Sequence, residues 1–218
     1  MADLILGSTT AISESGGALT LGTISGGTLG SGVTYPAGMI IKTYQKCFKA
    51  RQSYSTTCAS PPIDSDYVVI GTGANGSSEG DPLRLTTDTP ATSSSKYLIT
   101  CQVHQCRSQD GSLGFMLMYD VSGVPTRMVT GTPTGNNYMD CTFGKGHPST
   151  TGNAGNYGTH QTGTMYLWSP GSASAQTIQI GGANYNTNAN YINSPYNTDN
   201  GPYMVRVIST LTVQEIAG

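Results

Sequence analysis

A glycine-rich motif follows the apolar run 67–70 and resembles a nucleotide-binding turn, since residues 71–76 fit G-x-G-x-x-G. That motif binds a dinucleotide when a helix starts at its end, because the amino-terminal amides of the helix bind the pyrophosphate. Here Gly80 and Pro82 would break such a helix within its first two turns. We therefore interpret the segment as a connection between two strands and expect no cofactor.

Potential zinc ligands occur at two places in the chain. Cys101, His104 and Cys106 fall on one predicted strand. Positions 101 and 106 differ by an odd number, so a regular strand directs them to opposite faces. His147 and His160 lie in a later polar segment, with no C-x-x-C or H-x-x-x-H pair of the kind that zinc sites use. We expect no metal and interpret the thiols as small apolar core groups.

Catalytic hydroxyl and carboxylate groups lack a recognisable arrangement. Serine and threonine are abundant, but no G-x-S-x-G elbow is present. Most acidic residues sit among turn-forming residues, where hydrogen bonding to nearby backbone amides explains them. The sequence favours a non-enzymatic protein with no catalytic residue, and spacing alone leaves an enzyme open as a minor alternative.

Two polar segments are candidates for ligand contact. The insertion 144–163 has no strand pattern, and the stretch 184–193 is rich in asparagine and contains two tyrosines. Long loops on a rigid β scaffold are common binding sites, and tyrosine rings beside amides suit a sugar or a protein surface. An ordinary tight loop that leads into a strand is the simpler alternative for 184–193. The residues predicted to contact a host or ligand are His147, Tyr157, His160, Tyr185 and Tyr191.

Composition narrows the class of protein. The chain has 218 residues, of which 10% are charged, and a formal net charge of -2, so no basic surface for nucleic acid is expected. No stretch approaches the roughly 18 apolar residues of a membrane span, and the start has no signal-peptide pattern. Five cysteines leave at least one thiol unpaired, and we expect most to be reduced.

The elements that must position these residues are short strands. Gly, Ser, Thr and Asn are frequent, Val, Ile and 13 tyrosines are interspersed, and no window has a sustained helical period. Many short strands with turn signals between them predict an all-β sandwich or barrel. Strands are predicted at 38–48, 66–70, 83–86, 96–106, 113–120, 126–130, 164–168, 176–181, 189–193 and 203–216.

Two of these strands, 113–120 and 203–216, are apolar on both faces. A sandwich strand usually turns one face to water, so a second apolar face suggests a subunit contact. Covering by the same chain is the alternative, and periodicity does not separate the two. The residues predicted for a trimer interface are Phe115, Leu117, Tyr119, Val205, Val207, Leu211 and Val213.

Residues 1–34 differ in composition from the rest and predict an extended arm. Their short apolar clusters cannot form a core alone, so we expect them to lie against other copies or another protein. A flexible tail is the alternative. Pro36 marks the boundary with a head domain at 35–218. The residues predicted to attach the arm are Leu4, Ile5, Leu6, Leu19, Leu21 and Ile24.

Four segments carry a family resemblance. MADLILGSTT at 1–10, TYPAGMI at 34–40, TSSSKYLI at 92–99 and STLTVQEIAG at 209–218 resemble virion proteins of marine tailed bacteriophages. The resemblance implies an amino-terminal attachment segment and a C1q-like or TNF-like antiparallel jelly roll that trimerises through its apolar strands. The cysteines and the insertion at 144–163 depart from the commoner pattern.

The same resemblance implies a location and partners. It implies a homotrimer, made in the host cytoplasm and built into the virion as a fibre or spike. Such a trimer binds capsid or tail proteins through its arm and contacts a host-surface glycan or protein. Capsid decoration, which cements the shell, is the alternative function, and a free carbohydrate-binding module is a further one. No membrane insertion is expected.

Overall fold

A computed structural model gives the architecture of the chain. It describes residues 4–6, 9–15, 18–21, 35–54, 63–71, 82–107, 113–128, 142–145, 160–184, 190–193 and 207–218. Backbone contacts divide the chain into two units, Met1–Thr34 and Tyr35–Gly218, at the position where the sequence places the boundary.

The first unit is a small antiparallel sheet of three strands, β1 (Leu4–Leu6), β2 (Thr9–Ser15) and β3 (Ala18–Leu21). Its register brings Leu4, Ile12 and Leu21 into one cross-strand row. The sequence predicted an extended arm, whereas the strands pair with one another. Two consecutive glycines separate β2 from β3 in the sequence, and a Gly-Gly pair favours a two-residue hairpin.

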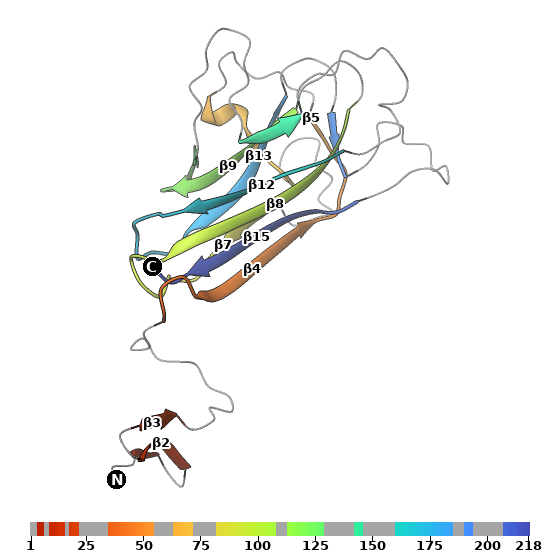
Figure 1. Cartoon of the computed structure of the whole chain (residues 1–218). Coiled ribbons are helices and arrows are strands. Elements are labelled where there is room, and N and C mark those ends of the chain that lie inside the picture. Colours follow the sequence, from red (N-terminus) through yellow and green to blue (C-terminus); the bar gives the residue numbers. More distant parts are fainter. Residues whose placement is uncertain are drawn as a thin grey trace. The chain divides into compact units, whose positions relative to one another are not determined.

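The second unit is a sandwich of two antiparallel sheets. One sheet has the order β4-β15-β8-β14-β5, and β12 pairs with the other edge of β8 (Figure 1). Its strands are β4 (Ile40–Phe48), β5 (Gln52–Tyr54), β8 (Lys96–Arg107), β12 (His160–Trp168), β14 (Asn190–Ile192) and β15 (Ser209–Ile216).

The second sheet has the order β10-β9-β13-β6, with β11 also pairing with β9 and β7 with β13. In Figure 1, β9 and β13 lie behind the first sheet. Its strands are β6 (Val68–Val69), β7 (Arg84–Thr86), β9 (Leu113–Val121), β10 (Val124–Arg127), β11 (Phe143–Lys145) and β13 (Thr177–Asn184).

The strand order is jelly-roll-like. We count β4 with β5, β6 with β7, β10 with β11, and β14 with β15 as single positions, which gives eight positions along the head. The sheets then have the orders 1-8-3-6 and 5-4-7-2. This order, in which the first and last strands pair, corresponds to the two Greek keys of a jelly roll.

The core lies between the sheets, and in β8 buried residues alternate with more exposed ones. In β8, Ile99, Cys101 and Val103 point inward, and each is at most 1% exposed. Trp168 packs between two tyrosines, with ring centroids 6.1 Å from Tyr97 and 5.1 Å from Tyr119. Each fully buried large apolar side chain contributes about 1.5–3 kcal/mol to folding, so this layer fixes the register of both sheets.

Every strand range predicted for the head overlaps a strand of the structure. Two strands were not predicted, β5 and β11, and both have only three residues. The predicted insertion 144–163 also contains strand, because β12 begins at His160, which pairs with Gln105 of β8. In the part of the chain that the structure describes, the one helical element is a 3-10 turn at Asp64–Asp66.

Candidate functional site

The outer surface of the sheet β4-β15-β8-β12 is the first candidate site. Cross-strand partners project to the same side of a sheet, so the register gives three rows of four residues. They are Cys47-Thr210-Gln102-Gly163, Gln45-Thr212-Thr100-Met165 and Thr43-Gln214-Leu98-Leu167. We call these twelve residues the open face.

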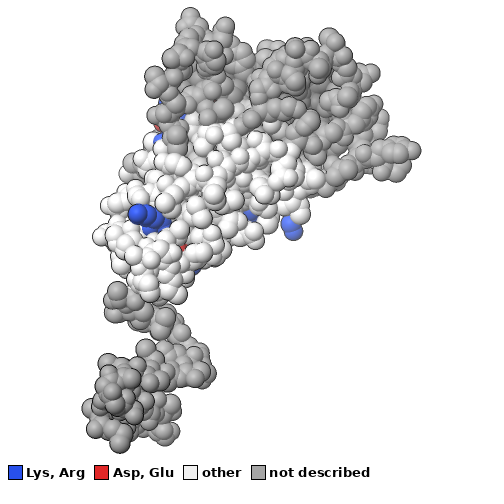
Figure 2. Space-filling model, in the orientation of Figure 1, with Lys and Arg blue, Asp and Glu red and all other residues white. Residues whose placement is uncertain are grey.

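The open face carries no charge and exposes large apolar side chains. Figure 2 shows it as a white area, because none of the twelve residues is Lys, Arg, Asp or Glu. Met165 is 69% exposed and Leu167 is 51% exposed, and both belong to β12. Exposed apolar residues that adjoin one another indicate a contact surface more strongly than isolated ones do.

The outer surface of the second sheet differs, because the chain itself covers it. Met116 and Met118 of β9 point away from the core, yet both are fully buried. They cluster with Tyr67 and Ala183. Covering by the same chain, the alternative left open by periodicity, therefore accounts for the second apolar face of strand 113–120.

The residues predicted for the trimer interface are corrected by this arrangement. Phe115, Leu117, Leu211 and Val213 belong to the core of one chain and have no exposed surface. They cannot contact a second subunit while the head is folded. The ring of Tyr119 packs against Trp168 of the same chain. Of the remaining two, Val207 is partly buried and Val205 lies outside the described residues.

A groove between β4 and β7 is the second candidate site. Its volume is about 470 Å³. Among the described strands, β4 ends the order of one sheet and β7 pairs only with β13 in the other, so the groove runs along the side of the sandwich. It is lined by Tyr44, Gln45, Lys46, Pro82, Arg84, Leu85 and Thr86.

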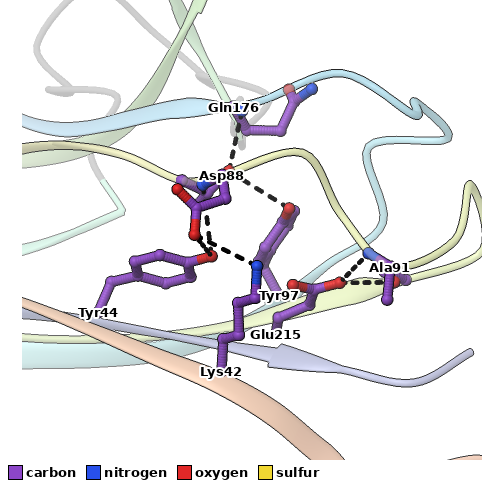
Figure 3. Close-up of polar contacts among 9 residues, drawn as sticks. Lys42, Tyr44, Asp88, Ala91, Tyr97, Gln176 and Glu215 are labelled. Carbon is purple, nitrogen blue, oxygen red and sulfur yellow. Dashed lines mark hydrogen bonds and ion pairs between the residues drawn. The ribbon is translucent and has the colours of Figure 1, made fainter. Parts of the chain in front are cut away.

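Hydrogen bonds fix one end of the groove by connecting β4 to the segment after β7. Figure 3 shows Lys42 and Tyr44 directed toward Asp88. The Lys42 ammonium lies 3.2 Å from the Asp88 carboxylate, and the backbone amide of Asp88 donates to the Tyr44 hydroxyl at 3.3 Å. The hydrogen bond to Asp88 raises the pKa of Lys42, and burial raises the pKa of Tyr44.

A buried carboxylate anchors the same segment to the C-terminal strand. Glu215 is fully buried, and one of its oxygens accepts hydrogen bonds from the Ala91 amide at 2.6 Å and the Ser95 hydroxyl at 2.9 Å (Figure 3). The other oxygen has no hydrogen-bond partner in the described part. Burial also raises the pKa of Tyr97, whose hydroxyl lies 3.4 Å from the Thr87 hydroxyl. These contacts connect the segment after β7 to β8 and β15.

Of the residues predicted to contact a host or ligand, His147, Tyr157 and Tyr185 lie outside the described residues. His160 begins β12, and Tyr191 lies in β14. Their strands flank β8 at the same end of the sheet, because both β12 and β14 pair with Gln105.

The Tyr191 ring forms a cation–π contact, with the Arg51 guanidinium 4.0 Å from the ring centroid. This pair was not predicted from the sequence. The predicted attachment residues Leu4, Ile5, Leu6, Leu19 and Leu21 fall in strands of the first unit, and Ile24 lies outside the described residues.

The thiols that the structure describes are unpaired. Cys47 and Cys101 are free, and burial raises the pKa of Cys101 to about 12. Burial also lowers the pKa of His104. Within the described ranges, no three His, Cys, Asp or Glu side chains gather as metal ligands would. No helix in those ranges has the length and apolar character needed to span a bilayer.

Sequence reasoning missed both the open face and the groove. The open face alternates Thr and Gln with core residues, which is also typical of a solvated strand. The fold and these surfaces define an all-β, jelly-roll-like domain joined to a small β-sheet unit. No protein-family model matches the chain, and no curated protein matches it.

Proposed function

We propose that the protein is a non-enzymatic structural protein of a tailed-bacteriophage virion. In this proposal its head is a C1q-like or TNF-like jelly roll that forms a homotrimer, and its first unit binds capsid or tail proteins. The assembled trimer is a fibre or spike that contacts the host. The support is the jelly-roll-like strand order, a separate amino-terminal unit and the resemblance of four sequence segments to virion proteins.

The observation that carries the trimer is the exposure of Met165 and Leu167 on an uncharged sheet surface. A sheet patch of four strands and five residues covers roughly 300–400 Å², from strand spacings of about 4.8 Å and rises of about 3.4 Å. A stable interface buries about 800 Å² per partner. The proposed contact therefore extends past the open face, toward Met39 and Ile40, which are 48% and 49% exposed.

The first unit suits attachment because its register aligns apolar residues of all three strands. Leu4, Ile12 and Leu21 form one row. A unit this small buries little apolar surface of its own, so it gains little stability from its own core. A second protein that covers the row would stabilise it, which is the role we assign to the capsid or tail.

Sedimentation of the full chain at micromolar concentration tests the trimer. The chain has a mass of 22.7 kDa, so a trimer sediments near three times that mass. Met165→Lys places a charge in the open face and should yield monomers. Val124→Lys is the matched control, because Val124 is 62% exposed and lies in the other sheet. A wild-type protein that stays at 22.7 kDa would refute the trimer.

Cryo-electron microscopy of the particle tests the location. Density on the tail or on projecting stalks supports a fibre. Density that covers junctions between capsid subunits supports the decoration alternative, which buries the first unit and the underside of the head. Absence of the chain from the particle refutes both, and binding of a neutral glycan by the free head would then favour a carbohydrate-binding module.

A further inference from the structure

Strand β12 forms one edge of the first sheet and differs in charge from the strand at the opposite edge. Among the strands that the structure describes, β12 pairs with β8 alone, and β4 ends the order on the other side (Figure 1). Natural sheets protect their edge strands with charged side chains, lysine above all, or with proline. β4 carries Lys42 and Lys46, whereas residues 161–168 of β12 include neither a charged residue nor a proline. β12 is therefore the unprotected edge.

Burial along β12 indicates that this edge is open. The core-facing residues of β8, which are Ile99, Cys101 and Val103, are at most 1% exposed. Tyr166 and Trp168 of β12 pack against the same core but are only partly buried. β8 has strands on both sides, whereas the described strands flank β12 on one side only, and this difference accounts for the exposure. A further strand beside β12 would complete the cover of its core-facing residues.

The register identifies the backbone groups that face this edge. In an antiparallel pair, residues that bond the neighbouring strand alternate with residues that face away from it. His104 of β8 faces away from β12, because its amide donates to the Ser209 hydroxyl at 3.1 Å and its carbonyl accepts from the Asn193 amide at 2.8 Å. The odd-numbered residues of β8 therefore bond β12, through even-numbered partners such as Thr164 and Tyr166. The outward-facing amides and carbonyls of β12 belong to the residues between these partners, Gly163, Met165 and Leu167.

We propose that β12 pairs antiparallel with β12 of a second copy of the chain, across a two-fold axis near Met165. The first sheets of the two copies then form one continuous sheet, in which the outward amides and carbonyls of each copy bond those of the other. Like charges directly opposite each other destabilise such a pair, and the uncharged run 161–168 avoids them in any register. An axis near Met165 also places Gly163 opposite Leu167, so a residue without a side chain faces a large one.

This contact goes beyond the proposed trimer and is independent of it. The trimer would bury side chains of the open face, whereas the two-fold pairing uses backbone groups at the edge of β12. Pairing alone gives a dimer of twice 22.7 kDa, and pairing together with the trimer gives an assembly of six times that mass. A dimer without a trimer would refute only the trimer, and a trimer without any larger species would refute only the pairing.

Hydrogen exchange of the wild-type full chain tests the pairing without any substitution. The amides of Gly163, Met165 and Leu167 should exchange slowly in the paired species and at least about tenfold faster after dilution to the unpaired one, because only pairing bonds them. The amides of Thr164 and Tyr166 bond β8 and should be protected in both. A contact through side chains of the open face would not produce this alternation along one strand.

Two variants at one position separate the backbone from the side chain. Met165→Pro removes an outward-facing N–H that β8 does not use, which an edge strand tolerates. Each copy then loses a hydrogen bond to the other, so the dissociation constant measured by sedimentation should rise at least about tenfold. Met165→Thr is the matched control, because it shortens the side chain, keeps the N–H and favours a strand. Its dissociation constant should stay within about threefold of the wild-type value.

Three results would overturn the proposal. One is a wild-type chain that sediments only as a monomer or a trimer at millimolar concentration, which would leave this edge to an extended segment of a different protein. The second is fast exchange at Met165 in a dimer or hexamer, which would assign that assembly to another surface. The third is an equal dissociation constant for Met165→Pro and Met165→Thr, because the outward N–H would then contribute nothing.

Discussion

Asn193 joins β4 to β15 in the first sheet, and its replacement is predicted to destabilise the head strongly. It follows β14, is 1% exposed and has a φ of 62°, in the left-handed region. Its side-chain amide donates to the carbonyls of Phe48 at 2.6 Å and Ala50 at 3.2 Å. Its side-chain oxygen accepts from the Ser209 hydroxyl at 2.6 Å. One side chain thus connects the end of β4 to the start of β15.

The magnitude follows from the groups that lose a hydrogen-bond partner. Asn193→Ala takes one buried hydrogen-bond partner from two carbonyls and from the Ser209 hydroxyl, whose oxygen still accepts from the His104 amide at 3.1 Å. Each such loss costs about 1–3 kcal/mol. We expect a loss of roughly 3–6 kcal/mol in the free energy of unfolding, a large part of the roughly 5–15 kcal/mol of a typical domain. Asn193→Gly loses the same hydrogen bonds but tolerates the positive φ, so it should be about 1 kcal/mol more stable than Asn193→Ala.

Urea unfolding of the full chain measures both differences. Trp168 is the one tryptophan in the sequence and packs, partly buried, against the core, so its fluorescence reports on the head. The expected order of stability is wild type, then Asn193→Gly, then Asn193→Ala. If Asn193→Ala lies within about 1 kcal/mol of wild type, the hydrogen bonds do not contribute as argued. If Gly is the less stable variant, the positive φ is not the source of strain.

Three further predictions concern Gly163, Cys101 and Ser95. Gly163→Ala should lower stability by about 1–3 kcal/mol, because a Cβ there would lie 2.3 Å from the Cys101 carbonyl oxygen; an unchanged melting temperature would contradict this. Cys101, with a thiol pKa raised to about 12 from 9.0, should resist thiol reagents in the folded protein while Cys47 reacts, as peptide mass spectrometry can show. The pKa of the Cys101 thiol is higher in the folded protein than in the unfolded chain. The free energy of unfolding should therefore fall as the pH rises from 9.0 toward 12. Ser95→Ala should lower the free energy of unfolding by about 1.5–3 kcal/mol, because it removes a hydrogen bond to the buried carboxylate of Glu215. A melting temperature equal to that of the wild type would show that this hydrogen bond does not stabilise the head.

The strands of the head were predictable because alternation records burial directly. In β8, the residues at 97, 99, 101 and 103 are buried and alternate with more exposed ones, as the sequence pattern indicates. The three-residue strands β5 and β11 are too short to carry a period. The pairing of β1, β2 and β3 was missed because their short apolar clusters were interpreted as contacts for other chains.

The surfaces were harder to predict, because a sequence pattern shows which side chains are apolar but not what covers them. Met116 and Met118 form a second apolar face on β9 that suggested a subunit contact. Tyr67, from a distant part of the sequence, packs against them in the structure. The groove likewise depends on β4 and β7, which belong to different sheets and become neighbours only in the folded sandwich.

The open face is best judged by its apolar residues and not by its missing charges. Only 10% of all residues in the chain are charged. Twelve uncharged residues on the open face are therefore expected from the composition alone. Two adjoining side chains of β12 that are 69% and 51% exposed are a stronger signal, because water contacts with large apolar groups are unfavourable. β12 also contributes one edge of its sheet, where a partner can approach without displacing any strand. A charge at Met165 therefore tests the contact more directly than any change at the buried residues of β9 and β15.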